Sequence, residues 1–342
     1  MEASKTQEKE LLNQVDLCNS KGLLNKECIG WARKPLIRCN LTGHKFRKKK
    51  WNYWLILNDD CLFSATISNI DYLGMVFIYF YNYKTGEFIE KTIPSPLGKG
   101  CIMLAGVNDS VEYTSSSMRV SFKGEDENTK MRVECSEFGK GTISVDLNIK
   151  RPENYEGINV VIPWSKKKFQ FTSKQNCIPV EGKIIYNGET FELHKEKSFA
   201  SLDFGRGVWP YNTSWNWATG SGSFNNRVIG LNLGGTWTDG TGMTENGFVI
   251  DGIVNKLGEN IIFEYDRDNI MKPWHLKSKD CDRVDIIFQP IYKRIAVTNA
   301  FVLKSKVCQI LGEFSGDLIT DKGEKVHFEK LKGSAEEHFA RW

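Results

Sequence analysis

The sequence predicts an all-β protein in which two lipocalin-like or calycin-like antiparallel β-barrels pack together. Three observations predict this fold: apolar and polar residues alternate in one segment after another, turn sequences lie close between these segments, and convincing amphipathic helices are almost absent. The lack of helices excludes an alternating βα fold. No fixed repeat is present, which disfavours a propeller, and antiparallel strands at this density avoid exposed edges most simply by closing into barrels.

The alternation is clearest between residues 118 and 149, where each segment has one apolar face. These faces carry Met118, Val120 and Phe122, then Met131, Val133 and Cys135, then Ile143, Val145, Leu147 and Ile149. Turn sequences at 84–86, 187–188 and 321–323 contain glycine after a polar residue, which is typical of hairpins. The strands are therefore expected to be half-buried and antiparallel.

With 342 residues, the chain is too long for one ordinary core, so two domains are expected. Residues 1–15 form a polar N-terminal segment, 16–172 the first barrel domain and 180–342 the second. The junction is expected between 173 and 180, because the alternation lapses there into polar residues and a proline. Within the first domain, residues 16–43 predict an ordered but irregular lead-in.

The charge and the apolar pattern exclude several kinds of partner. A net charge of +4 is small for this length and indicates no nucleic acid. The basic run 45–50 fits a solvated turn better than a phosphate site. No apolar run is long enough to span a membrane, and the N-terminus lacks the apolar core of a signal peptide. We therefore expect a cytoplasmic protein without stable membrane insertion; no oligomeric state is predicted.

The nine cysteines are scattered, odd in number and without a C-x-x-C pair, so they predict reduced thiols rather than disulfides or a zinc ribbon. Cys18, Cys28 and Cys39 lie fairly close together in the sequence, but their spacing does not match a zinc site. The phosphate-binding, dinucleotide-binding, zinc-protease and hydrolase motifs are all missing. We expect neither a metal nor a cofactor.

The most unusual segment, 203–222, combines an acid, an arginine, five large aromatic residues and four glycines. Glycines let the backbone approach closely, and aromatic rings supply flat walls. A carboxylate beside a guanidinium could orient or protonate a ligand held between them. The alternative is a barrel corner that is closed by an Asp203–Arg206 ion pair and core tryptophans. The candidate ligand-binding residues here are Arg206, Trp209, Tyr211, Trp215 and Trp217.

A second cluster, 245–252, adds Asn246 as a ligand-binding candidate and Asp251 as a candidate acid. On a strand, Asp251 would share a face with the apolar Val249 and Ile253, an unfavourable place for a carboxylate. Such a group either pairs with Arg206 or Arg227, or has a raised pKa and acts as a general acid or base.

The C-terminal run 333–342 ends on Trp342 after acids, a histidine and an arginine. Glu337 and His338 could transfer protons. Docking of a short terminal segment through Trp342 is the simpler interpretation, so this segment is expected to be ordered.

Six ordered blocks over nearly the whole chain resemble a bacterial family catalogued as domain of unknown function 2804. The blocks are 17–18 with 30–41, Trp51-Asn52-Tyr53-Trp54, 203–222, 246–252, Met271-Lys272-Pro273-Trp274 and 335–342. More distantly, the W-x-W-x-x-G and I-D-G elements are similar to the double-calycin group that includes carotenoid hydratases and tocopherol cyclases. That resemblance implies acid-assisted hydration, cyclisation or isomerisation of an apolar unsaturated substrate.

We expect the protein to have one of two functions, both of which involve an apolar or unsaturated small molecule. The first is a cofactor-independent lyase or isomerase, in which Asp251 or Asp203 moves a proton and the tryptophans form the walls of a cavity in the C-terminal half. The alternative is a non-catalytic binding or carrier protein with the same cavity. A structural protein would instead have barrels filled by side chains. An acid that faces the cavity unpaired would favour the enzyme.

Overall fold

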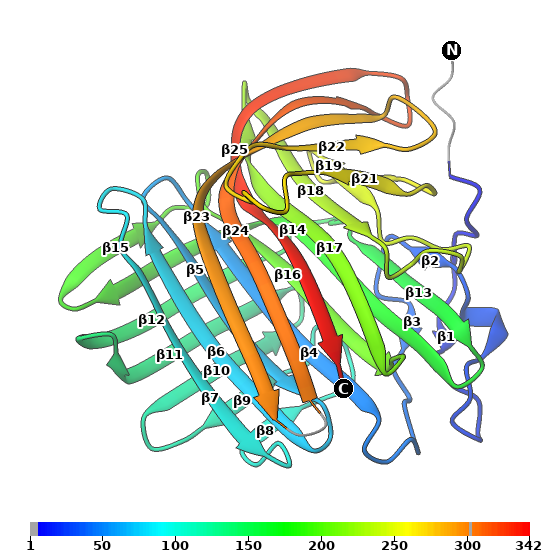
Figure 1. The fold of residues 1–342 in the computed structure, drawn as a ribbon, viewed down its shortest axis with the longest axis horizontal. Helices are drawn as coiled ribbons and strands as arrows, with labels where there is room; N and C mark the ends of the chain where they lie inside the picture. The colour runs from blue at the N-terminus through cyan, green and yellow to red at the C-terminus, as the bar shows by residue number, and fades with distance from the viewer. Residues whose placement is uncertain (1–5, 301–302) are drawn as a thin grey trace.

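The computed structural model describes residues 6–300 and 303–342 (Figure 1). Residues 1–5 of the expected polar segment lie outside this range. Strands dominate the described chain, and its only helix is the short 3-10 turn η1 (Lys26–Cys28), so the all-β prediction is confirmed. Over the same residues, no helix has the length and apolar character that crossing a bilayer requires.

The first sheet has 14 strands, and all of its pairs are antiparallel. Its strands are β2 (Trp31–Ala32), β4 (Lys48–Leu57), β5 (Cys61–Asn69), β6 (Leu73–Asn82), β7 (Phe88–Pro96), β8 (Cys101–Met103), β9 (Val111–Thr114), β10 (Met118–Glu125), β11 (Asn128–Phe138), β12 (Gly141–Lys150), β13 (Ile158–Ser165), β14 (Lys168–Tyr186), β15 (Glu189–Leu193) and β16 (Phe199–Val208). The main order is β7-β6-β5-β4-β16-β14-β12-β11-β10-β9-β8. The sheet curls so that β8–β12 lie across β4–β7.

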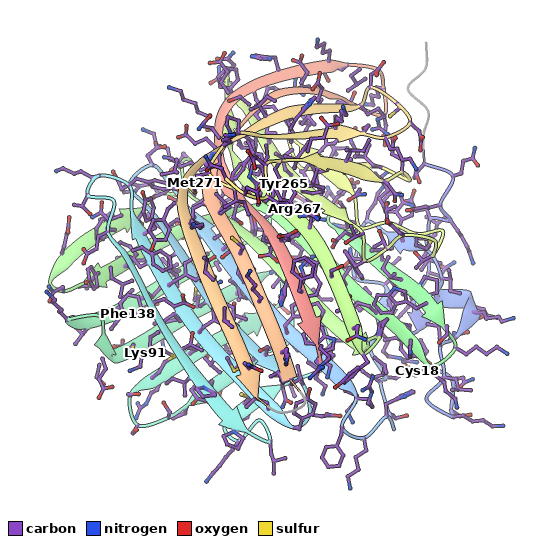
Figure 2. All side chains as sticks on the ribbon, viewed as in Figure 1. Cys18, Lys91, Phe138, Tyr265, Arg267 and Met271 are labelled. Carbon is purple, nitrogen blue, oxygen red and sulfur yellow. The ribbon has the colours of Figure 1, made fainter. Side chains whose placement is uncertain are left out.

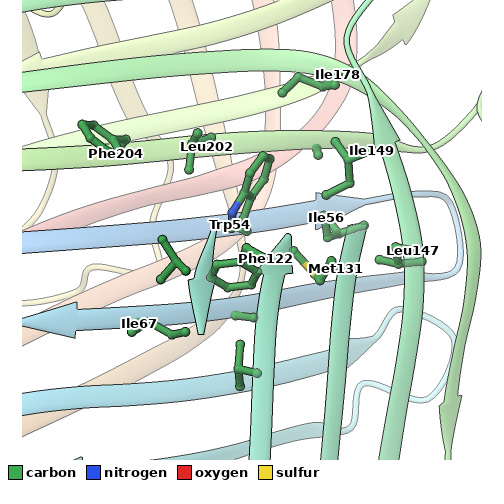
Figure 3. Close-up of a cluster of buried hydrophobic side chains, with 14 of the residues drawn as sticks. Trp54, Ile56, Ile67, Phe122, Met131, Leu147, Ile149, Ile178, Leu202 and Phe204 are labelled. Atoms are coloured by element: carbon green, nitrogen blue, oxygen red, sulfur yellow. The ribbon is translucent and has the colours of Figure 1, made fainter. Parts of the chain in front are cut away.

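The core of the first barrel lies inside this curl. Trp54 and Ile56 of β4 point inward and meet Phe122 of β10 and Met131 of β11 (Figure 3). These residues are fully buried because alternate side chains of every strand point to the same interior. The predicted apolar faces between 118 and 149 thus form one wall of this core.

The second sheet has nine antiparallel strands in the order β20-β19-β18-β17-β25-β24-β23-β22-β21. They are β17 (Asn212–Phe224), β18 (Arg227–Gly235), β19 (Gly247–Ile250), β20 (Ile253–Lys256), β21 (Ile261–Glu264), β22 (Trp274–Ser278), β23 (Val284–Ala300), β24 (Leu303–Ile319) and β25 (Lys325–Arg341). The upper halves of the long strands curl around a second core that contains Trp274, Phe288 and Phe314. The two curled sheets confirm the predicted pair of calycin-like barrels.

The lower halves of β17 and β23–β25 lie across the outer face of β4–β6 and β16 (Figure 1). Tyr53 and Leu55 point to this outer face and pack with Trp217 and Leu311 of the second sheet. Strand β4 is therefore buried on both faces, which explains its nearly continuous apolar sequence from Trp51 to Leu57. This contact between the sheets holds the candidate site.

The lapse in alternation at 173–180, expected to be the junction, lies inside β14. The strand continues through it with an irregularity between Gln175 and Ile178, where Cys177 has a φ of 60°. The chain passes from the first sheet to the second only between Val208 and Asn212. The polar residues there are buried: the amide of Asn176 donates to Thr219 Oγ1 (2.9 Å) and to the carbonyl of Leu231 (3.1 Å) on the second sheet.

The two ends of the chain differ in how closely they follow the predictions. The lead-in 16–43 is irregular as expected, with only two-residue strands such as β1 (Val15–Asp16), which pairs in parallel with β3 (Ile37–Arg38). The C-terminal segment is ordered, but it does not dock as a separate piece. It is the end of β25, a central strand between β17 and β24.

Candidate functional site

A cavity of about 450 Å³ lies between the two sheets, within the range typical of small-molecule sites. Its wall on the first sheet comes from β4–β7, β14 and β16, and its wall on the second from β17 and β23–β25. The expectation of a cavity in the C-terminal half is therefore corrected, because both halves build it. The reason is that strands of the second sheet pack on the outer face of the first.

Strand register aligns the lining residues in rows that cross each sheet. On the first sheet, one row of neighbours runs through Lys174, Asp203, Tyr53, Thr66, Phe77 and Thr92. On the second sheet, the corresponding row runs through Trp217, Glu336, Gln309 and Arg294. All of these residues line the cavity. Each row thus places its polar groups on one level of the cavity.

Tryptophan rings form one end of the cavity. The ring of Trp209 stacks on Trp237 with centroids 5.0 Å apart and also contacts Trp215 and Trp342 at 5.6 and 5.7 Å. The indole Nε1 of Trp209 donates to Oε1 of Gln170 at 2.7 Å, which fixes the orientation of the ring. The result is a rigid apolar surface in which the indole nitrogens of Trp209, Trp215 and Trp237 each have an acceptor.

A buried ion cluster lies on the floor of the cavity. The ammonium of Lys174 lies 3.0 Å from Asp203 Oδ1 and 2.9 Å from Glu245 Oε2. Trp237 Nε1 donates to Glu245 Oε1 at 2.7 Å, and the Lys174 Nζ also lies 4.5 Å from the ring centre of Trp217. Burial alone would lower the pKa of Lys174, but the two carboxylates outweigh it and raise that pKa. The Lys174 ammonium therefore stays charged.

Opposite this cluster, Glu336 presents a carboxyl group that no cation neutralises directly. Among the described residues, it has no ion-pair partner within 4.0 Å. Trp215 Nε1 donates to its Oε1 at 3.0 Å, and Gln309 Nε2 donates to its Oε2 at 3.2 Å. Burial raises the pKa of Glu336 to about 7, so protonated and ionised forms coexist near neutral pH.

His338 lies two residues further along β25 and faces the same cavity. Its Nε2 is 2.8 Å from Ser305 Oγ, and its ring lies against Trp215 with centroids 3.9 Å apart. Burial, with a smaller contribution from the positive charge of Arg294, lowers the pKa of His338 to about 3. The imidazole is therefore neutral at physiological pH.

Arg294, which lies on the same level of the cavity as Glu336, already has an ion-pair partner. The guanidinium of Arg294 pairs with Glu90 of β7, with Nε 3.1 Å from Glu90 Oε2. It also covers the faces of Phe77 and Tyr79 at about 5 Å from their centres. This pair bridges the two sheets at the side of the cavity.

Four of the predicted site residues line the cavity: Asp203, Trp209, Trp215 and Trp217. Arg206 does not, because β16 is a regular strand, so residues 203 and 206 point to opposite faces. The Arg206 guanidinium is fully buried towards the first core, where it donates to the Trp51 carbonyl and to Asn52 Oδ1, both at 2.8 Å. Burial lowers its pKa to about 10. The alternative Asp203–Arg206 ion pair is not formed.

Two other candidates lie outside the cavity lining. Tyr211 is 39% exposed, and the guanidinium of Arg47 lies 6.0 Å from its ring centre. Asn246 is fully buried, but its Oδ1 accepts from the Gly234 amide (2.6 Å) and its Nδ2 donates to the Glu259 carbonyl (2.9 Å). Asn246 thus holds the loop that carries Glu245, the residue that does reach the cavity.

Asp251 also lies outside the cavity. The expectation of a strand position is wrong, because β19 ends at Ile250 and Asp251 begins the turn before β20, with a φ of 50°. Its side chain is 44% exposed and pairs with Arg227, one of the two partners that were expected. It also accepts from the Val228 amide at 2.8 Å. The pair fastens a hairpin turn.

At the C-terminus, the strand alternation separates the expected proton-transfer pair. His338 faces the cavity, whereas Glu337 points to the opposite face of β25 and accepts from the Tyr265 hydroxyl at 2.8 Å. Tyr265 and Arg267 lie over the upper part of β25 in Figure 2. The sequence reasoning missed Glu336, Glu245 and Lys174. Glu245 lies in a loop, and Lys174 and Glu336 share their strand faces with other polar residues, so no local pattern marks these three positions.

The clustered cysteines offer no metal site in the structure. Cys18, Cys28 and Cys39 are buried free thiols, and burial raises the pKa of each well above its ordinary value. Within residues 6–300 and 303–342, no group of three or more His, Cys, Asp or Glu side chains is arranged to hold a metal ion.

Comparisons with known proteins give a family and a fold. The model of a family described as domain of unknown function 2804 matches residues 8–342. A search of curated proteins finds no similar sequence. Among solved structures, an AttH candidate from Nitrosomonas europaea has a TM-score of 0.51 at 9% identity, covering 86% of this chain and 93% of that chain.

Two further solved structures are similar. CghA, solved with Sch210972, has a TM-score of 0.51 at 10% identity, covering 85% of this chain and 87% of that chain. Kievitone hydratase from Nectria haematococca has 12% identity and covers 88% of this chain and 90% of that chain, but its TM-score of 0.44 does not establish a shared fold. At 9% and 10% identity, the similarities to the AttH candidate and to CghA concern the fold alone.

Proposed function

Because the chain belongs to the domain of unknown function 2804 family, whose name carries no activity, we propose a function from the geometry of the cavity. The protein catalyses proton transfer to an apolar, unsaturated small molecule without a cofactor, as a hydratase, isomerase or cyclase does. Glu336 is the general acid and base. The tryptophans around Trp209 hold the substrate.

The observation that carries this proposal is the environment of the Glu336 carboxyl group and its raised pKa. A carboxyl group that is buried beside an indole, faces a cavity and has a pKa of about 7 can donate a proton and take one back at neutral pH. Asp203 and Glu245 are less suited to donate, because Lys174 lies within 3.0 Å of both. Their role is to hold the Lys174 ammonium on the opposite wall.

The proton balance of the step is simple. Protonated Glu336 gives its proton to one carbon of a C=C bond, and positive charge develops on the other carbon. The Glu336 carboxylate that forms then removes a proton from a neighbouring carbon, which isomerises the double bond, or from an attacking water, which hydrates it. Neutral His338 can hold such a water through a ring nitrogen. No oxidant or reductant is needed.

The experiment is deuterium exchange in heavy water. A panel of apolar alkenes, including farnesol and methyl linoleate, is incubated with the wild-type protein and with Glu336→Gln, and the recovered compounds are analysed by mass spectrometry. We expect deuterium on carbon, or added heavy water, with the wild type only. Tryptophan fluorescence measures binding in parallel.

The control is Glu337→Gln, because Glu337 lies next in sequence but points away from the cavity. It should retain the exchange. Compounds that bind equally to both proteins and exchange in neither would indicate a carrier instead of an enzyme. Exchange that persists in Glu336→Gln would contradict the assignment of the acid.

A further inference from the structure

One lysine of β4 is buried without an acceptor. Lys49 shares its strand face with Trp51 and Tyr53 and has 0% exposed surface. Its Nζ has no hydrogen-bond partner among the described residues, and it lies 5.0 Å from the ring centre of Tyr72 and 5.4 Å from that of Trp342. A buried, unpaired ammonium is costly, so its presence calls for a ligand or another reason.

The two rings beside Lys49 add further unsatisfied groups. The hydroxyl of Tyr72 and the indole Nε1 of Trp342 are both buried, and neither has a hydrogen-bond partner within the described part of the chain. Asp71, the acid whose charge acts on Lys49, accepts instead from the Lys48 amide at 3.2 Å and lies 3.6 Å from the Lys48 ammonium. Lys49 thus lies beside two rings whose polar atoms, like its own Nζ, have no acceptor among the described residues.

This group of residues lies beside one end of the cavity, and of its three members only Trp342 is itself a lining residue. Trp51 and Trp342 line the cavity, and Ile70, two residues from Tyr72, lines it as well. Tyr53 and Trp51 lie on the cavity floor with their neighbours across the sheet. Lys49 is the next residue of β4 on the same face, beyond Trp51. The C-terminus lies close to this lower end of β4 in Figure 1.

We propose that Lys49, Tyr72 and Trp342 bind a carboxylate, so that the ligand of this cavity is an unsaturated carboxylic acid with an apolar chain. This inference rests on the proposed function of the same cavity. Lys49 supplies the positive charge, and the two aromatic side chains supply neutral donors. The tryptophan walls hold the apolar chain.

The geometry also gives a chain length between the acid and the reacting bond. Tyr53 lies four residues from Lys49 along β4, which corresponds to about 13 Å. Gln309 donates both to Tyr53 and to Glu336, so Glu336 lies on the level of Tyr53. At ~1.2 Å per bond in an extended chain, roughly ten chain atoms separate the carboxylate from the double bond.

The test compares cis-parinaric acid with its methyl ester, both of which report binding by their own fluorescence. For the wild-type protein at pH 7, we expect the acid to bind at least tenfold more tightly than the ester. In Lys49→Met the acid should lose this advantage, while the ester should bind as it does to the wild type. Lys49→Arg should keep part of the preference.

The matched control is Lys45→Met, which removes an exposed charge from the same basic run. It should leave both affinities unchanged. Equal binding of acid and ester to the wild type would overturn the carboxylate site and leave the apolar cavity intact. Failure of both probes to bind would overturn the cavity proposal and the carboxylate site together.

A pH titration of the wild type tests the site without a substitution. Burial, and to a smaller extent the charge of Arg47, lower the pKa of Lys49, Asp71 opposes them, and the resulting pKa is about 8. The ammonium is therefore present below pH 8 and is progressively lost above it. The affinity for the acid should weaken above pH 8, whereas the affinity for the ester should not. Parallel pH curves for the two probes would contradict the proposal.

Discussion

The indole Nε1 of Trp215 donates a 3.0 Å hydrogen bond to Glu336, and this contact joins neighbouring strands β17 and β25 inside the cavity. The bond satisfies one carboxyl oxygen without bringing a positive charge close to it. The bond itself lowers the pKa of Glu336, but burial outweighs it and the pKa stays raised at about 7. The pH dependence of stability and the proposed proton transfer both depend on the protonation state of the Glu336 carboxyl group.

Glu336→Gln is expected to gain stability relative to the wild type as the pH rises. Burial raises the folded-state pKa of Glu336 from its ordinary value of 4.5 to about 7. Its stabilising contribution is therefore complete below pH 4.5 and lost by pH 7, a change of roughly 3 kcal/mol. Thermal unfolding at pH 5 and pH 8 checks this. A difference between the two proteins that does not depend on pH would show an ordinary pKa.

His338→Gln is expected to reduce the loss of stability in acid. The pKa of His338 is lowered from 6.5 to about 3, mainly by burial, so its neutral form contributes stability above pH 6.5 that is lost as the pH falls towards 3. Between pH 4.5 and 6.5 this effect opposes that of Glu336. Denaturant unfolding of the variant across this range should therefore show stability that rises as the pH falls, more steeply than in the wild type.

Lys174→Met is expected to destabilise the protein strongly, by about 3–5 kcal/mol, because it leaves Asp203 and Glu245 buried without their shared cation. Adding Glu245→Gln should restore part of the loss. The control is Lys91→Met, which breaks an ion pair with the exposed Glu137 and should cost no more than about 1 kcal/mol. Chemical denaturation measures all three proteins. Similar losses for the two single variants would contradict a buried cluster.

Asp251→Asn is expected to leave ligand binding unchanged, because Asp251 lies in a half-exposed turn outside the cavity lining. Asparagine tolerates the positive φ of this position, so the stability should fall by about 1 kcal/mol or less. Asp203→Asn removes a charge from the cavity wall and should change binding. Tryptophan fluorescence with methyl linoleate compares the two variants. An equal effect on binding would contradict this separation.

The sequence was sufficient for the fold and for the aromatic part of the site. Alternation and turn residues predict antiparallel strands because they are local properties of the chain. The same period of two would have separated Asp203 from Arg206, and the Asp-Gly pair at Asp251 is itself a hairpin signal. The period of two at 203–206 and the Asp-Gly turn signal at 250–253 were both present in the sequence. The site prediction instead followed the unusual composition of these segments.

Glu336 could not be predicted in the same way. Its place in the cavity depends on β25 lying between β17 and β24 and on the second sheet covering the outer face of the first. These are pairings between distant segments, and no local pattern specifies them. The lapse in alternation near Asn176 has a related cause: the polar residues there are buried because the second sheet supplies their hydrogen-bond partners.

The late position of β25 has a consequence during synthesis on the ribosome. The first sheet is complete once Val208 has emerged, yet the cover of its apolar outer face is complete only when residues 325–341 arrive between β17 and β24. At cellular elongation rates this interval is on the order of ten seconds. The nascent chain therefore exposes part of an apolar, aggregation-prone surface during this interval, and β25 both completes the cover of that surface and delivers Glu336.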